Sequence, residues 1–142
     1  MAKAYIAPLL RSRVTDAARQ RCGYCRTSRQ VIGPLLEIDH IVPQALGGAS
    51  DENNLWLACP LCNRYKSSQT EAVDPQLQEI VLLFNPRIQQ WSEHFEWVEE
   101  GTIIRGITGV GRATVDALRL NIADRVAVRR LWVTAGWHPL PE

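Results

Sequence analysis

Two Cys-x-x-Cys pairs separated by a long insert constrain this chain more than any other feature. The first pair is Cys22 and Cys25, the second is Cys59 and Cys62, and 33 residues lie between the pairs. Two such pairs can hold one Zn²⁺ tetrahedrally as thiolates, whereas ordinary zinc ribbons place only about 15–20 residues between them. A closed four-thiolate site leaves no position open for a substrate. We therefore expect a structural zinc ion, with function carried by residues of the insert.

The composition is that of one ordinary globular domain. The chain has 142 residues, of which 46% are hydrophobic and 22% charged, and we expect residues 1–142 to form a single domain. No apolar run approaches the roughly 20 residues that cross a bilayer, and residues 1–10 lack the pattern of a signal peptide. These features predict a cytoplasmic protein without membrane contact. A reducing compartment also favours a metal over disulfides at the four cysteines.

The charge is unevenly distributed along the chain. Residues 1–70 carry nine Lys and Arg against five Asp and Glu, whereas residues 71–142 carry seven against ten. A basic half that holds the cysteine motif suits a polyanionic partner such as nucleic acid. A chance scatter of solvated charges explains the asymmetry equally well, so it supports a nucleic-acid substrate only together with the motifs.

The region around the cysteines predicts a compact ββα unit. Residues 34–39 and 54–58 are short apolar segments that suit strands, and the prolines and glycines of residues 41–53 indicate a loop between them. Pro60 stands where a helix can begin, because its fixed φ suits the first helical turn, and we expect this helix to reach about residue 68. An earlier helix is expected over residues 9–20.

The second half of the chain, about residues 71–142, predicts further elements. They are a helix or strand over 77–83, a hairpin formed by 94–98 and 102–106, a helix from about Gly111 and a helix over 123–134. The last helix carries Val126, Leu131 and Trp132 on its expected apolar side. The expected fold is therefore α+β, with a zinc-stabilised ββα core over about 22–68 and an extension that adds a C-terminal hairpin and helices.

Four polar side chains in or near the insert are candidates for a catalytic site. A carboxylate such as Asp39 suits a hard divalent ion such as Mg²⁺ or Mn²⁺, and the neutral imidazole of His40 can take a proton from water. Asn63 directly follows a zinc cysteine, and its amide oxygen is a candidate second ligand of the same ion. Lys66 shares a helix face with Asn63 and is a candidate contact for a substrate phosphate. Packing or solvation would explain each residue alone, so it is their combination that indicates a site.

This stretch resembles the HNH endonucleases of the ββα-metal class, in a compact bacterial form. The matching segments are Leu36–Gly48, which reads LEIDHIVPQALGG, and Asn53–Lys66, which reads NNLWLACPLCNRYK. In the resemblance His40 is the first H, Asn54 is the central N, and Asn63 occupies the position of the final H. The resemblance implies that Asn54 pins the loop after His40 by backbone hydrogen bonds. Because an amide oxygen is a harder ligand than an imidazole, Mg²⁺ or Mn²⁺ is the expected catalytic ion, with Ni²⁺ or Co²⁺ as alternatives.

The function expected from the sequence is metal-dependent hydrolysis of phosphodiester bonds in DNA, with double-stranded DNA as the substrate and the oligomeric state left open. His40 would be the general base, and Asp39 and Asn63 would bind the catalytic ion. Asn54 would act through the loop, and Lys66 would add positive charge near the phosphate. Two alternatives remain at this stage. One is a non-catalytic zinc-knuckle module that binds nucleic acid, and the other is a protein-interaction domain in which zinc only supports the fold.

Overall fold

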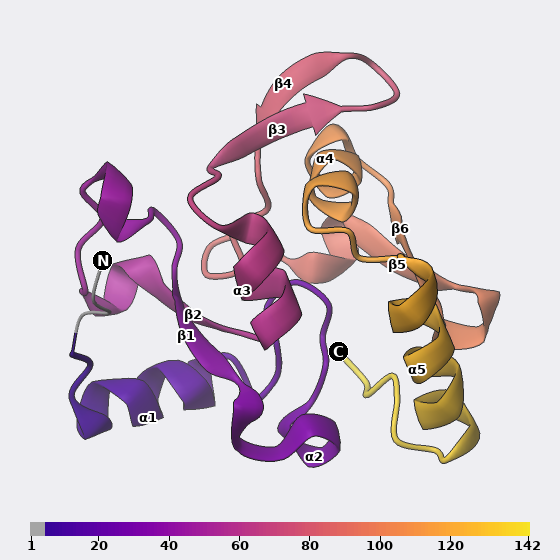
Figure 1. Ribbon diagram of the computed structural model, residues 1–142, viewed down its shortest axis with the longest axis horizontal. Coiled ribbons are helices and arrows are strands. Elements are labelled where there is room, and N and C mark those ends of the chain that lie inside the picture. The colour runs from indigo at the N-terminus through magenta and orange to yellow at the C-terminus, as the bar shows by residue number, and fades with distance from the viewer. Residues whose placement is uncertain (1–4) are drawn as a thin grey trace.

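The computed structural model describes residues 5–142, in which three separate two-stranded antiparallel sheets are combined with helices (Figure 1). The helices are α1 (Pro8–Ala17), α2 (Arg29–Ile32), α3 (Pro60–Lys66), α4 (Gly109–Ala117) and α5 (Ala123–Thr134). The strands are β1 (Glu37–His40), β2 (Leu55–Ala58), β3 (Glu71–Asp74), β4 (Glu79–Leu82), β5 (Phe95–Val98) and β6 (Ile103–Gly106). This mixture of helices and strands confirms the predicted α+β fold.

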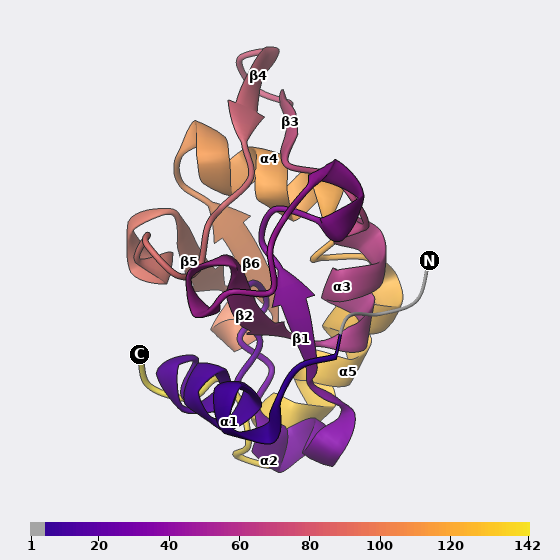
Figure 2. The same ribbon diagram turned by 90° about the vertical axis from the view of Figure 1, so that its left-hand side faces the viewer.

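The β1–β2 hairpin and α3 form the ββα unit predicted from the sequence. The two strands pair in antiparallel fashion, and His40 at the end of β1 lies opposite Leu55. α3 begins at Pro60, and the Sγ atom of Cys59 caps it by accepting a hydrogen bond from the backbone N–H of Cys62 at 3.4 Å. α3 packs beside β1 (Figures 1 and 2), so the end of the strand faces side chains of the helix.

The remaining elements follow the sequence pattern with a few differences. The first predicted strand begins later than expected, because Gly33–Leu35 form a 3₁₀ turn before Glu37. The segment that suited either a helix or a strand is a strand, since β4 pairs with β3 along its whole length. The predicted hairpin of β5 and β6 is present, α4 begins slightly before Gly111, and α5 has the predicted bounds.

A cluster of buried side chains joins the cysteine pairs to the second half of the chain. Tyr24, between the first two cysteines, is fully buried in the same cluster as Phe84, Trp91 and Leu118. The indole N–H of Trp91 donates a hydrogen bond of 2.8 Å to the backbone carbonyl of Tyr24. The extension therefore packs directly against the segment that carries the first cysteine pair.

The buried face of α5 differs from the one predicted from its apolar residues. Leu131 is 70% exposed, whereas Arg125 and Arg129 are only 7% and 2% exposed. The prediction of an apolar buried face was therefore wrong at Leu131. The physical reason is that α5 faces hydrogen-bond acceptors, namely backbone carbonyl oxygens and a cysteine sulfur, which guanidinium groups can satisfy and a leucine cannot.

The helices are short compared with a membrane span. Within residues 5–142 no helix is both long and apolar enough to cross a bilayer. α5 has 12 residues, whereas a spanning helix needs about 20. Residues 1–4 of the segment considered for a signal peptide lie outside the described residues.

Candidate functional site

The four cysteines converge on one point, as their spacing predicted. All four are buried, and their Sγ atoms lie within 4.8 Å of one another. The Sγ atoms of Cys25 and Cys59 are 3.6 Å apart, which is close to the ~3.8 Å separation of sulfurs around a tetrahedral zinc with Zn–S bonds of about 2.3 Å. A disulfide would require about 2.05 Å. The donor set therefore fits one Zn²⁺ ion.

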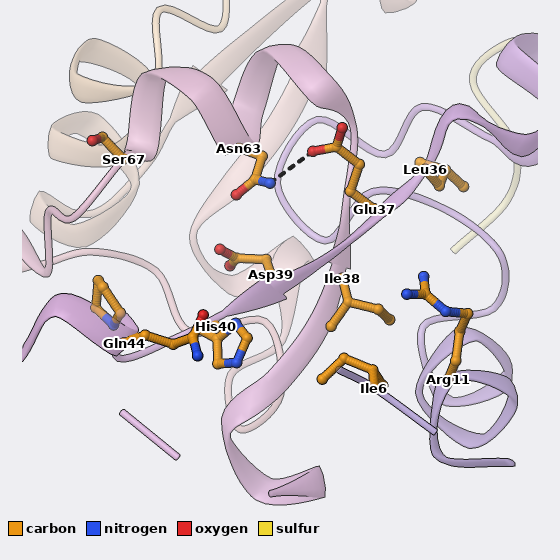
Figure 3. A pocket seen from close by; sticks show the side chains of 11 residues that line it. Ile6, Arg11, Leu36, Glu37, Ile38, Asp39, His40, Gln44, Asn63 and Ser67 are labelled. Atoms are coloured by element: carbon orange, nitrogen blue, oxygen red, sulfur yellow. Dashed lines mark hydrogen bonds between the residues drawn. The ribbon is translucent and has the colours of Figure 1, made fainter. Parts of the chain in front are cut away.

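A second site is a pocket of about 300 Å³ at the side of β1 (Figure 3). Asp39, His40 and Asn63, three of the predicted catalytic residues, all line this pocket. Glu37 from β1 and Arg11 from α1 line it as well, and neither was predicted as a catalytic residue from the sequence. Adjacent side chains of a regular strand point to opposite faces. Because β1 ends at His40, the side chain of His40 is not bound to this alternation and can line the same pocket as that of Asp39.

Asp39 is held in place by two buried donors. It is 3% exposed, the hydroxyl of Tyr24 donates to its Oδ2 atom at 2.8 Å, and the ammonium of Lys66 lies 3.3 Å from its Oδ1 atom. Burial raises the pKa of Asp39, and the nearby Lys66 charge and the Tyr24 hydrogen bond partly offset this rise. Each carboxylate oxygen has two lone pairs, so these contacts leave acceptor positions for a cation.

Lys66 does not occupy the position predicted for a phosphate contact. Its side chain is 2% exposed, and besides Asp39 it donates to the backbone carbonyls of His40 at 3.0 Å and Ile41 at 3.2 Å. The prediction placed Lys66 on the helix face of Asn63 as a contact for a substrate phosphate, but the carbonyl oxygens at the end of β1 and the carboxylate of Asp39 take up its donors. The ammonium thus compensates the charge of Asp39 and fixes the backbone at the end of β1.

His40 is oriented by a side chain that sequence reasoning did not find. Its Nε2 atom lies 2.9 Å from the hydroxyl of Ser50. Burial lowers the pKa of His40, which favours the neutral imidazole near pH 7. In the tautomer in which Nε2 donates its hydrogen to the Ser50 hydroxyl, Nδ1 is the ring nitrogen that can accept a proton. Ser50 lies in the predicted loop, ten positions after His40, and no motif in the loop sequence predicts this contact.

Asn54 fastens the loop that follows His40. Its Oδ1 atom accepts a hydrogen bond from the N–H of Val42 at 2.8 Å, and its Nδ2 atom donates to the carbonyls of Val42 at 2.9 Å and Ala49 at 2.8 Å. These are backbone contacts of the kind expected from the resemblance. Gly48 completes the loop, since a Cβ atom there would lie 1.7 Å from the carbonyl oxygen of Val42.

Asn63 is oriented by Glu37. The Nδ2 atom of Asn63 donates a hydrogen bond of 2.7 Å to the Oε1 atom of Glu37. Figure 3 shows that the oxygen end of the Asn63 amide therefore lies on the side of Asp39. The alternation of β1 provides a signal that could have identified Glu37, because residues 37 and 39 lie on the same face of a strand.

Comparison with known proteins agrees with this architecture. Residues 22–69 match the family model described as HNH endonuclease. The chain therefore contains an HNH endonuclease domain, whose family implies a nuclease-type function on nucleic acid. A curated relative is the Septu protein PtuB of Bacillus thuringiensis, which is 23% identical over 128 residues. The match covers 89% of this chain and 46% of the relative, so the chain spans about half the length of that protein.

Proposed function

We propose that this protein is a divalent-metal-dependent endonuclease that hydrolyses phosphodiester bonds in double-stranded DNA. The observation that carries the proposal is that one pocket collects the imidazole of His40, the carboxylate of Asp39 and the amide oxygen of Asn63. A base and a set of oxygen ligands within one pocket are what metal-assisted hydrolysis of a phosphodiester requires. The basic first half of the chain suits the polyanionic substrate.

The donor set of the pocket fits a hard cation. Asp39 and Asn63 would bind the catalytic ion through oxygen, and such ligands favour Mg²⁺ or Mn²⁺ over Ni²⁺ or Co²⁺. When bound, the ion would stabilise the charge that develops on the scissile phosphate and the leaving oxygen. Tyr24 and Lys66 fix the carboxylate of Asp39, and Glu37 fixes the amide of Asn63, so that both oxygen ligands are held before the ion arrives.

In this proposal His40 activates the attacking water. The proton of the water moves to Nδ1 of His40, while the N–H at Nε2 remains bonded to Ser50. The lowered pKa of His40 keeps the imidazole neutral and ready to accept that proton. Asn54 contributes indirectly, because its hydrogen bonds hold the loop that carries Ser50.

Incubation of zinc-loaded protein with supercoiled plasmid and single divalent ions tests the proposal. We expect Mg²⁺ or Mn²⁺ to produce nicked or linear DNA, and a chelator that removes these ions but leaves zinc bound to stop the reaction. Parallel reactions with single-stranded DNA and with RNA identify the preferred substrate. Salt-sensitive DNA binding without cleavage by any ion would instead support the non-catalytic zinc-knuckle module. Neither cleavage nor binding would support the protein-interaction domain.

Variants of Asn63 should change the metal requirement in a pattern set by Glu37. Asn63→Ala removes a ligand and should require more Mg²⁺ or Mn²⁺ for half-maximal cleavage. Asn63→Asp keeps an oxygen ligand but places a carboxylate against that of Glu37, so it should retain partial activity that improves when Glu37→Gln restores a donor. Asn63→His should shift the preference toward Ni²⁺ or Co²⁺, with Glu37 accepting the imidazole N–H.

Metal titrations of cleavage by these variants measure the effect. The double variant Asn63→Asp with Glu37→Gln serves as the internal control, because it restores one hydrogen bond between the same two positions with donor and acceptor exchanged. Superimposable titration curves for the wild type and Asn63→Ala would show that Asn63 does not bind the catalytic ion and serves only at the start of α3.

Arg11 should contact the DNA backbone in place of Lys66. It lines the pocket from α1 and is exposed, whereas the ammonium of Lys66 is used inside the protein. Arg11→Ala should weaken DNA binding for all sequences and reduce the slope of log affinity against log salt by about 1. The measurement is fluorescence anisotropy with a His40→Ala background, which prevents cleavage during the titration.

The matched control is Arg13→Ala on the same helix. The guanidinium of Arg13 donates to both oxygens of Glu52, at 2.9 and 2.8 Å, so it is occupied within the protein. We expect this variant to change the salt slope less than Arg11→Ala. If Arg11→Ala and the wild type have the same slope of log affinity against log salt, Arg11 does not contact the DNA backbone.

A further inference from the structure

The C-terminal helix α5 lies outside the matched span 22–69, yet it places a buried charge against the cysteine cluster. Arg125, in the first turn of α5, is 7% exposed. Removing a guanidinium from water is costly unless it is paired and hydrogen-bonded. The groups that contact Arg125 therefore indicate which negative or polar partner compensates its buried charge.

The partners of Arg125 are two zinc-site sulfurs and two backbone oxygens. Its Nη2 atom lies 3.1 Å from Sγ of Cys62 and 3.8 Å from Sγ of Cys59. Its Nη1 atom donates to the carbonyl of Leu118 at 3.1 Å and lies 3.5 Å from that of Arg119. Within residues 5–142 no carboxylate lies at ion-pair distance from Arg125. In the described part of the chain, the sulfurs are thus the only partners of Arg125 that can carry a negative charge.

The charge of the loaded site complements that of Arg125. Four thiolates around one Zn²⁺ carry a net charge of −2, and in a buried site such a charge needs nearby donors. The next buried arginine of the same helix differs. Arg129 contacts uncharged oxygens, among them the carbonyl of Thr102 at 3.0 Å and Oδ1 of Asn121 at 3.2 Å. Of these two arginines, only Arg125 contacts the cysteine sulfurs.

We propose that Arg125 is the charge partner of the zinc thiolates and that zinc loading controls the docking of α5. The guanidinium donates to the ligands Cys59 and Cys62 and thereby lowers the cost of holding a dianionic zinc site inside the protein. Without zinc the thiolates are no longer gathered beside Arg125, and its buried charge loses its partner. The C-terminal helix then separates from the HNH domain.

The coupling is reciprocal because it is a free energy shared by two sites. If bound zinc strengthens the docking of α5, then the docking of α5 through Arg125 must strengthen zinc binding by the same factor. This gives part of the extension a role that the HNH span does not supply: it completes the environment of the metal. The inference rests on the proposed zinc site and is independent of nuclease activity.

Zinc release from purified protein tests the role of Arg125. The rate is followed with a colorimetric chelator in excess, without DNA. Arg125→Met should release zinc about 10-fold faster or more, because removing a group that hydrogen-bonds metal ligands typically weakens metal affinity about 10–100-fold. Arg125→Lys should be intermediate, because it keeps the charge but loses the second donor. Arg130→Met, at an exposed arginine of the same helix, is the matched control and should release zinc at the wild-type rate.

Two further measurements separate this role from a general loss of packing. With Cd²⁺ in place of zinc, the ¹¹³Cd resonance should move in Arg125→Met and stay in place in Arg130→Met, because it reports on the thiolates. In the wild type, amide hydrogen exchange of residues 123–134 should accelerate on zinc removal more than that of α1.

The outcomes decide the proposal in each case. The proposal is overturned if Arg125→Met releases zinc at the wild-type rate. It is also overturned if the amides of α5 remain fully protected from hydrogen exchange after zinc is removed. Should Arg125→Met not fold, the decision passes to Arg125→Lys, where faster release supports the proposal and wild-type release overturns it. A wild-type protein that binds no zinc would overturn the zinc site and this inference together, whatever its nuclease activity.

Discussion

Replacing His40 with alanine is expected to lower the rate of DNA cleavage by about 10²–10⁴-fold, the usual contribution of a general base. The folded protein should keep its zinc, its melting temperature and its affinity for the catalytic ion, because the side chain is only partly buried and, within residues 5–142, is hydrogen-bonded only to Ser50. The measurement is the first-order rate of plasmid nicking at saturating Mg²⁺ or Mn²⁺.

The pH profile provides a second measure of the same role. Burial lowers the pKa of His40 below the ordinary value of about 6.5, so the base stays unprotonated at pH values where an ordinary histidine would already carry a proton. Wild-type activity should therefore persist into mildly acidic solution and fall only as His40 becomes protonated. His94→Ala is the control. The ring of His94 is hydrogen-bonded to Thr108 and is not part of the proposed site, so this variant should retain activity. Cleavage by His40→Ala at the wild-type rate would sink the assignment.

Replacing Cys59 with serine is expected to remove zinc and to destabilise the fold strongly. Structural zinc binds with apparent free energies of about 10–16 kcal/mol in small peptides, and this binding energy is coupled to folding. The loss is comparable with the ~5–15 kcal/mol that stabilises a typical domain. Cys59 also caps α3 and contacts Arg125, so its removal affects three interactions at once.

Zinc stoichiometry and thermal unfolding check this prediction. Ala58→Ser is the matched control, because it introduces the same hydroxyl at the neighbouring, fully buried position without removing a ligand. It should cost about 1–3 kcal/mol for the buried hydroxyl and keep one zinc per chain. A Cys59→Ser protein that retained both zinc and its melting temperature would exclude a structural role for the metal.

The parts of the fold that depend on local sequence could be predicted. The cysteine spacing gave the convergence of the four sulfurs, Pro60 gave the start of α3, and the periodic pattern of residues 123–134 gave the bounds of α5. The segment around β4 could not be decided, because a short apolar run suits both helix and strand until its pairing with β3 is known.

The orientation of the site depends on contacts between distant segments, and here prediction failed. Glu37 reaches Asn63 across 26 positions, and Ser50 reaches His40 across a loop. Lys66 was placed on the correct helix, but its burial depends on acceptors at the end of β1. Sequence periodicity identifies which residues share an element; it does not show which polar groups of other elements will meet them.

The buried ion pair of Asp39 and Lys66 restricts how this protein can evolve. Replacing either residue alone leaves an unpaired charge inside the domain, which costs about 3–5 kcal/mol, a large share of its stability. Replacing His40 leaves no such charge behind. A descendant that gave up hydrolysis and kept only nucleic-acid binding should therefore differ first at position 40. Positions 39 and 66 should remain unchanged in that lineage, or change together.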